Sequence, residues 1–222
     1  MKIEIYTIWD NSVVLLANHL TMKHLLLFLL LGCTNSAAPD VTGTALTKSK
    51  DFYEKLSDAA ISLTKDQIEY DPTYFTIAYP NGDVPKGKGV CTDVVIRAYR
   101  KMGIDLQKEV HEDMKKNFSK YPKAWGLKTT DSNIDHRRVP NLETFFGRFG
   151  ETLPVTNNAS DYKPGDVVSW ILPSGRHTHI GLVVNKKAPS GRYMIVHNIG
   201  SGQVMEDVLF EYEIRKHYRY KK

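Results

Sequence analysis

The sequence predicts an α+β fold in which helices precede an antiparallel sheet. Two observations predict this order. Before residue 150, apolar residues recur at helical spacing, and after Asp166 short runs rich in β-branched and aromatic residues alternate with turns. Helices followed by strands, rather than alternating with them, are typical of an antiparallel sheet with segregated helices. The 222 residues, 41% of them hydrophobic, suffice for one sizeable core.

A short apolar run near the N-terminus indicates export. Residues 25–31 are all leucine or phenylalanine, follow Lys23 and His24, and precede Gly32 and Cys33. This run is too short for a membrane-spanning helix, which needs about twenty residues, but a basic start and a short apolar stretch are typical of a secretory signal. The LLGC stretch resembles the lipobox of bacterial lipoproteins, which implies that Cys33 is acylated and anchors the chain to a membrane.

Two alternatives and an ambiguous start accompany this interpretation. Cleavage within residues 35–38 would release a soluble periplasmic or secreted protein, and an ordinary buried helix would also accommodate the apolar run. Met1 and Met22 are both candidate first residues. We predict a periplasmic or outer-membrane lipoprotein, or a soluble exported protein, with three parts: a leader over residues 1–32, a flexible tether over residues 33–48 and a single catalytic domain over residues 49–222.

Helices are expected where apolar residues share one face, and strands where such residues form short runs. The expected helices span residues 51–68, 91–102, 106–118 and 141–149. A turn-rich loop over residues 71–88 and an irregular segment over residues 121–140 lie between them. The expected strands form an antiparallel meander and span residues 166–172, 178–185, 192–198, 203–210 and 211–218.

Cys91 is the candidate nucleophile. If Cys33 is acylated or removed, Cys91 is left unpaired in an exported protein, where free thiols are uncommon. Cys91 falls in the first turn of an expected helix, where free N–H groups and the helix dipole lower the pKa of a thiol. Asp93 in the same turn has the opposite effect, so a partner base is needed. The alternative is a small, buried cysteine with a packing role.

His179 and His197 are the candidate partners of this cysteine, because they lie in two expected strands joined by a turn. In a hairpin with an even register, for instance with Asn185 opposite Tyr193, both imidazoles lie on one face of the sheet. Gly181 then faces His197, and His179 is its diagonal neighbour. An odd register would separate the two imidazoles.

Together these groups suit nucleophilic catalysis. His179 would accept the Cys91 proton, His197 would fix the tautomer of His179, and backbone N–H groups at the start of the helix would stabilise an oxyanion. A metal site formed by His177, His179 and His197 is an alternative, because residues i and i+2 on a strand share a face. Ordinary core or surface histidines are another.

One polar motif in the irregular segment is a candidate substrate-binding element. It could line a groove and hold a substrate carboxylate, or it could be a salt-bridged structural loop. Its residues are Asp135, His136, Arg137 and Arg138. Three further titratable residues are expected to be structural: His111 on an exposed helix face, His217 in a basic strand and Asp166 in a turn.

The order of these motifs resembles the NlpC-type cell-wall hydrolases of the papain-like superfamily. In that pattern a cysteine begins a helix, and strands corresponding here to PGDVVSW, HIGLVV and VHN follow. The resemblance implies a papain-like fold with Cys91 as nucleophile, His179 as general base and His197 as the third, orienting residue. More closely, residues 70–210, which include GVCTDVVIRAYRKMG and NIDHRRVPNL, resemble an uncharacterised bacterial family of YijF-like proteins.

These observations predict an exported cysteine amidase or peptidase that hydrolyses an amide bond of peptidoglycan through a thioester. A non-catalytic cell-envelope binding module, which a buried and unreactive Cys91 would indicate, is one alternative. A lipid-acting acyltransferase or hydrolase, which an apolar channel beside Cys91 would indicate, is another. The net charge of +5 is too mild to indicate nucleic acid. We expect a monomer that works without a metal or another cofactor.

Overall fold

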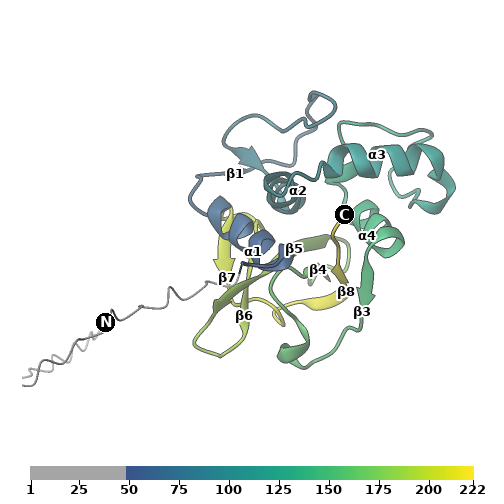
Figure 1. The fold of residues 1–222 in the computed structure, drawn as a ribbon. Coiled ribbons are helices and arrows are strands. Elements are labelled where there is room, and N and C mark those ends of the chain that lie inside the picture. The colour runs from purple at the N-terminus through teal and green to yellow at the C-terminus, as the bar shows by residue number, and fades with distance from the viewer. Residues whose placement is uncertain (1–48) are drawn as a thin grey trace, which may run out of the picture. The chain divides into compact units, whose positions relative to one another are not determined.

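Four α-helices and a six-stranded antiparallel sheet make up residues 49–222, the part of the chain that this computed structural model describes (Figure 1). The expected leader, the tether and Cys33 lie outside these residues. The helices precede the large sheet along the chain, so the predicted α+β class is confirmed. No helix between residues 49 and 222 is long and apolar enough to cross a membrane.

The helices lie close to their expected positions. They are α1 (Phe52–Leu63), α2 (Cys91–Lys101), α3 (Leu106–Lys116) and α4 (Val139–Phe149). Helix α1 is shorter than predicted because the hydroxyl and the N–H of Thr64 both donate to the carbonyl of Ile61, and residues 65–67 are exposed. Short 3₁₀ turns occur in the connections: η1 (Phe118–Lys120), η2 (Asp135–Arg137) and η3 (Ala159–Asp161).

The strands of the large sheet follow the order β3-β8-β4-β5-β6-β7, and all neighbours are antiparallel. They are β3 (Glu151–Leu153), β4 (Val167–Ile171), β5 (Thr178–Lys187), β6 (Tyr193–His197), β7 (Val204–Glu206) and β8 (Glu213–Arg219). A second, parallel pair joins the two ends of the predicted loop: β1 (Glu69–Tyr70) and β2 (Lys88–Gly89).

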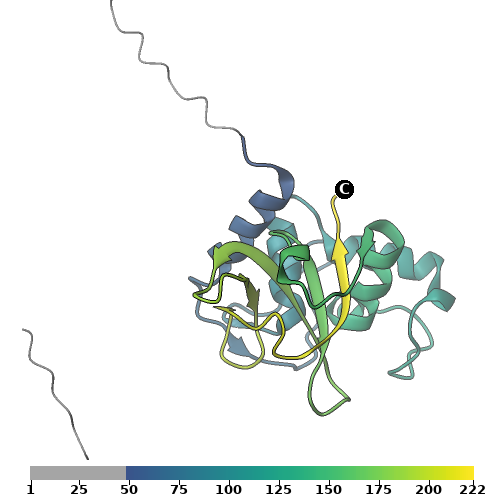
Figure 2. The ribbon, with the colours of Figure 1, turned by 90° about the horizontal axis from the view of Figure 1, so that it is seen from below.

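Strand β8, the yellow strand in Figure 2, departs from the predicted meander. Strands β4 to β7 are neighbours in sequence order, as expected, but β8 returns across the sheet and lies between β4 and β3. The strand predicted over residues 203–210 is confined to β7. Leu209 is fully buried instead, and its carbonyl accepts a hydrogen bond from the indole Nε1 of Trp170 at 3.0 Å.

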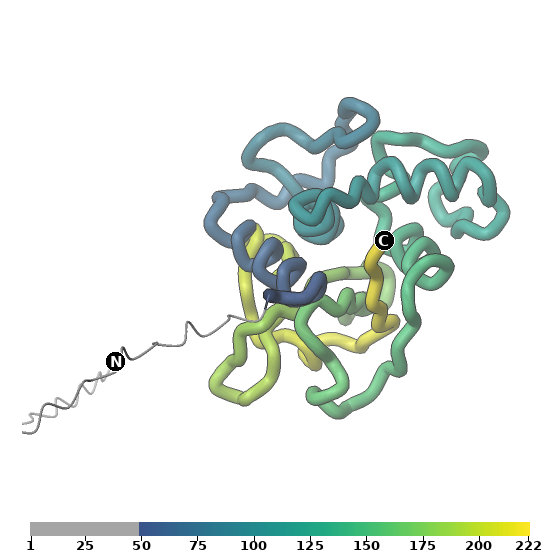
Figure 3. Tube along the Cα trace, viewed as in Figure 1, coloured from purple at the N-terminus to yellow at the C-terminus, as the bar shows by residue number. Residues whose placement is uncertain are grey.

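Each face of the large sheet carries a hydrophobic core. Helices α1 and α2 pack against β5 on one face (Figure 3), where Leu182 and Val184 are buried. On the other face, Trp170, Val183 and other buried side chains form a smaller core. Because side chains alternate along β5, His179 lies on the same face as Trp170, and their ring centroids are 5.7 Å apart.

Candidate active site

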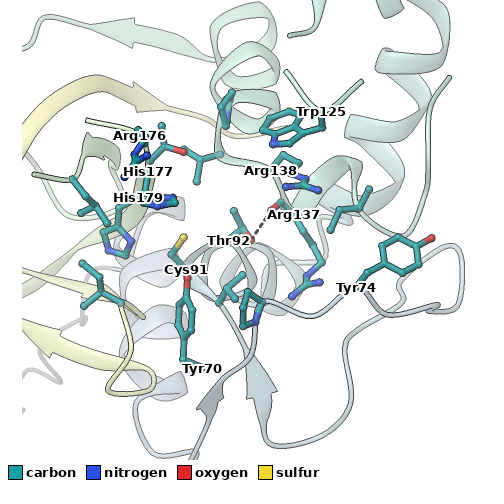
Figure 4. A pocket seen from close by; sticks show the side chains of 18 residues that line it. Tyr70, Tyr74, Cys91, Thr92, Trp125, Arg137, Arg138, Arg176, His177 and His179 are labelled. Carbon is teal, nitrogen blue, oxygen red and sulfur yellow. Dashed lines mark hydrogen bonds between the residues drawn. The ribbon is translucent and has the colours of Figure 1, made fainter. Parts of the chain in front are cut away.

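The first turn of α2 places Cys91 at the edge of a pocket. The N–H of Val90, just before the helix, donates to Asp93 Oδ2 at 2.7 Å, which caps the helix start. The side-chain amide of Asn198, just after β6, donates to the carbonyl of Gly89 at 3.2 Å. Cys91 is thereby held beside the sheet, and its sulfur points into the pocket towards the side where His179 lies (Figure 4).

A buried ion pair fixes this helix start from the other side. Arg137 Nε and a terminal guanidinium nitrogen donate to the two carboxylate oxygens of Asp93 at 3.0 and 3.1 Å, and both side chains are buried. The hydroxyl of Thr92 also donates to the carbonyl of Arg137 at 3.3 Å. The carboxylate of Asp93 is therefore committed to structure.

The hairpin of β5 and β6 brings the two predicted histidines together. Leu182 pairs with Val196, and continuing this pairing by one residue places Gly181 opposite His197. The predicted even register is therefore confirmed at the end of the hairpin that carries the two histidines. Nε2 of His179 lies 2.8 Å from Nδ1 of His197. The example pairing of Asn185 with Tyr193 is wrong, because an irregularity in β5 moves Tyr193 opposite Lys187.

Gly181 allows this close approach. A Cβ atom at that position would lie 2.8 Å from Cγ2 of Ile195 and 3.1 Å from Cβ of His197. Both distances are shorter than ordinary carbon contacts. A side chain at residue 181 would therefore push β6, and with it the imidazole of His197, away from β5.

Glu206, the last residue of β7, extends the pair into a chain of three groups. Its Oε2 lies 2.9 Å from Nε2 of His197. The imidazole of His197 is fully buried, whereas the carboxylate side chain is 47% exposed. Glu206 was not predicted from the sequence, although a hairpin of β6 and β7 places it on the same face of the sheet as His197.

The pocket beside Cys91 has a volume of about 590 Å³ and is open to solvent. Three arginines contribute to its polar walls, aliphatic and aromatic residues form its apolar walls, and no Asp or Glu is among the described residues that line it. The walls include Tyr70, Tyr74, Trp125, Arg137, Arg138, Arg176 and His177 (Figure 4). Four of these, Tyr70, Tyr74, Trp125 and Arg176, were not predicted; a tryptophan in a loop near a basic motif is the signal that was available for Trp125.

Burial overrides the expected activation of the thiol. Desolvation raises the pKa of Cys91 to about 12, and nearby Asp93 adds to this increase. The backbone N–H groups of Ile180, Thr92 and Cys91 itself lower the pKa, as predicted for a helix start, but by less. Desolvation and the neighbouring His197 lower the pKa of His179 to about 3. Thiol and imidazole are therefore both neutral at neutral pH.

We expect iodoacetamide to modify Cys91 slowly at neutral pH. The thiolate is the reactive form, and a pKa of about 12 keeps the folded protein in the thiol form over most of the accessible pH range. Relative to an unperturbed cysteine with a pKa of about 8.5, the rate at neutral pH should be lower by roughly three orders of magnitude. It should keep rising through pH 10.

Mass spectrometry of the Cys91 peptide over time, with a short cysteine peptide as the reference, measures this rate. A fast reaction with a plateau near neutral pH would instead indicate the low-pKa thiolate that the sequence suggested.

Two residues of the polar motif over residues 135–138 line the pocket, and the other two lie in the protein interior. Arg137 and Arg138 line the pocket, as expected for substrate-binding residues. Asp135 and His136 do not: both are almost fully buried within the fold. Asp135 bonds Nδ1 of His111 at 2.9 Å, so His111 is a partner of the motif and not a freely exposed residue. Burial and the adjacent Arg137 lower the pKa of His136 to about 3.

The carboxylate of Asp166 has a larger structural role than a turn requires. It accepts from the N–H of Lys163, as expected for the turn, and also lies 2.7 Å from Nε2 of His217 and accepts from Arg219. The imidazole of His217 is buried and stacks on Tyr162, with ring centroids 4.4 Å apart. This cluster fastens β8 to the start of β4.

The metal alternative has no matching arrangement in residues 49–222. No group of three His, Cys, Asp or Glu side chains in this range gathers closely enough to hold an ion. Nitrogens of His179 and His197 face each other at hydrogen-bond distance instead.

A cysteine at the start of a helix, beside an antiparallel sheet that carries two hydrogen-bonded histidines, gives this α+β protein the arrangement predicted for a papain-like fold. Residues 57–220 match the family model described as "Domain of unknown function (DUF1287)", and the chain belongs to this family. A relative from Escherichia coli (strain K12), described as "Uncharacterized protein YijF", is 50% identical over 183 residues, which are 82% of this chain and 89% of the relative. The predicted relation to YijF-like proteins is confirmed.

Solved structures similar to this chain share little sequence with it. NlpC1 from Trichomonas vaginalis has a TM-score of 0.42 and 14% identity, over 79% of this chain and 48% of NlpC1. This chain therefore spans about half the length of that protein. An N-acetylmuramoyl-L-alanine amidase from Bacteroides uniformis has a TM-score of 0.44 and 11% identity, over 76% of this chain and 99% of the amidase.

Proposed function

We propose that the protein is a cysteine hydrolase that cleaves an amide bond of peptidoglycan through a thioester on Cys91. One observation carries the proposal: Cys91, at the start of α2, shares a pocket with His179, whose Nε2 is bonded to His197. This arrangement contains a nucleophile, a base and a residue that orients the base. From the N-terminal sequence, we also propose that the protein acts outside the cytoplasm, with Cys33 as a lipid anchor.

The proposed reaction can start from the neutral thiol of Cys91 and the neutral imidazole of His179. As the sulfur attacks the amide carbon, the thiol proton moves to the free Nδ1 of His179, and N–H groups at the start of α2 stabilise the oxyanion. The carbon–nitrogen bond then breaks, and the same proton passes to the leaving amine. Water, deprotonated by His179, attacks the thioester and releases the acid and the thiol. Because thiol and imidazole are neutral at rest, proton transfer accompanies the attack and does not precede it.

The pocket walls support an anionic substrate. Three arginines line the pocket, and no Asp or Glu is among the described residues that line it. Arg137 is committed to Asp93, but no acceptor within residues 49–222 bonds the guanidinium of Arg138, which stacks over the Trp125 ring 4.6 Å from its centroid. We propose that Arg138 receives a substrate carboxylate and that Arg137 lines the same side of the pocket while it holds Asp93. Such walls favour an amidase over a lipid-acting enzyme, for which an apolar channel was expected.

Replacement of Arg138 should weaken substrate binding. In an Arg138→Ala variant we expect KM to rise about 10- to 100-fold with kcat changed less, because a charge-assisted hydrogen bond contributes about 1.5–3 kcal/mol. Steady-state kinetics on a soluble muropeptide measure both constants. Lys216→Ala, which removes an exposed cation on β8, is the control and should behave as the wild type. An unchanged KM in Arg138→Ala would contradict this role.

A non-catalytic binding module remains a second candidate, and the burial of Cys91 with its raised pKa favours it. One experiment separates the two. Purified peptidoglycan is incubated with the protein, and mass spectrometry identifies released fragments and newly formed amino groups. Fragments that have gained one water at a single bond support the hydrolase. Cosedimentation with peptidoglycan without any release would overturn it in favour of the binding module.

A further inference from the structure

Glu206 and the two histidines form a continuous chain of hydrogen-bonding groups that ends in the pocket. The Oε2 of Glu206 lies 2.9 Å from Nε2 of His197, and Nδ1 of His197 lies 2.8 Å from Nε2 of His179. Three of the four ring nitrogens of the two imidazoles are thus engaged. The fourth, Nδ1 of His179, is left for the pocket that Cys91 lines.

The carboxylate of Glu206, at the outer end of this chain, determines which ring nitrogens donate and which accept. An ionised carboxylate can accept hydrogen bonds but has no hydrogen to donate, so Nε2 of His197 must carry the proton. A neutral imidazole has one N–H, and burial lowers the pKa of His197 despite the opposing effect of Glu206. Nδ1 of His197 is therefore bare and accepts from Nε2–H of His179. His179, also neutral, is left with a bare Nδ1.

We propose that Glu206 is a positioning residue that selects these tautomers and so leaves Nδ1 of His179 as the acceptor for the Cys91 proton. The proposal rests on the proposed hydrolase function for its kinetic consequence, but not for the tautomers themselves. Without the carboxylate, the opposite arrangement becomes accessible, in which both imidazoles carry their proton on Nδ1. His179 in that arrangement cannot accept a proton from the pocket side.

The same carboxylate also acts during catalysis. When the sulfur–hydrogen bond breaks and a nitrogen–hydrogen bond forms on Nδ1, His179 becomes a cation. Glu206 places a negative charge at the far end of the hydrogen-bonded chain, which stabilises this cation through His197. Because 47% of the Glu206 side chain is exposed, replacing it disturbs the core less than replacing either histidine.

The tautomers can be read directly by long-range ¹H–¹⁵N NMR of the histidine rings, because protonated and bare ring nitrogens have well-separated shifts. In the wild type we expect His179 and His197 both to have protonated Nε2 and bare Nδ1. Glu206→Lys replaces an acceptor with a donor and should move the proton of His179 to Nδ1. Glu211→Lys, the same change at an exposed turn residue, is the matched control and should keep the wild-type pattern.

Kinetics supply the second measurement. Glu206→Lys should lose roughly 10²- to 10⁴-fold in kcat, the range that general acid–base catalysis contributes. Glu206→Gln keeps an oxygen acceptor but no charge, so we expect wild-type ¹⁵N shifts and a kcat lowered about 10-fold, with KM unchanged. This variant also tests the idea if the lysine variant does not fold.

The NMR and kinetic measurements distinguish a failure of the role of Glu206 from a failure of the proposed hydrolase function. A protonated Nδ1 on His179 in the wild type, or a wild-type pattern and rate in Glu206→Lys, would overturn the role of Glu206. If the wild type shows the expected tautomers and cleaves no peptidoglycan, the tautomer assignment stands and the proposed hydrolase function fails.

Discussion

A Cys91→Ala variant should fold normally and release no fragments from peptidoglycan. The thiol is the bond-forming group in the proposed reaction, and losing a nucleophile from a comparable triad costs roughly 10⁶-fold in kcat. The substitution removes one sulfur atom from a residue that is 7% exposed, so the fold should lose only about 1 kcal/mol. Fragment release followed by mass spectrometry, with a thermal melt of each protein, measures both effects.

His179→Ala tests whether cysteine and histidine act as a unit. It should also abolish release, and the double variant should be no worse than either single one, because groups that act on the same step are not additive. Lys216→Ala, remote from the pocket, is again the control and should release fragments at the wild-type rate. A Cys91→Ala protein that still cleaves peptidoglycan would rule out the thioester mechanism.

Arg137→Met should destabilise the domain by about 3–5 kcal/mol, because it leaves the carboxylate of Asp93 buried without its partner. This is a large share of the roughly 5–15 kcal/mol that holds a typical domain folded. Urea denaturation followed by circular dichroism measures the free energy of unfolding. Arg176→Met is the matched control: its side chain is exposed, so the change should stay within about 0.5 kcal/mol.

A second substitution separates the ion pair from simple loss of packing. Adding Asp93→Asn to Arg137→Met removes the unpaired charge, so the double variant should recover part of the lost stability. A single Arg137→Met variant that loses less than 1 kcal/mol would show that Asp93 finds solvent or another partner.

The parts of the site that local periodicity controls could be predicted from the sequence. The 3.6-residue pattern after Gly89 places Cys91 at a helix start, and the period of two in the hairpin places His179 and His197 on one face. The contact between the two imidazoles also depends on the register of the hairpin. That register is sterically possible because residue 181 is a glycine. Those inferences depend on neighbours within about twenty residues.

The parts that depend on burial and distant neighbours could not be predicted. Burial in the folded protein raises the pKa of Cys91, and no local sequence pattern around residue 91 indicates that the thiol is buried. Likewise, Asp135 and Arg137 belong to one short 3₁₀ turn, yet the fold turns one towards His111 and the other towards Asp93. The sequence places Asp135 and Arg137 in one polar motif, but tertiary packing gives each of them a different partner.

The place of β8 in the sheet has a consequence for biosynthesis. This strand is the last element of the chain, yet it lies between β4 and β3 and joins them. A growing chain therefore lacks an interior strand of this sheet until Glu213–Arg219 has been synthesised. The six-stranded sheet is therefore complete only once β8 has taken its place between β3 and β4. A product that terminates early lacks this strand and should be recognised by proteases as unfolded.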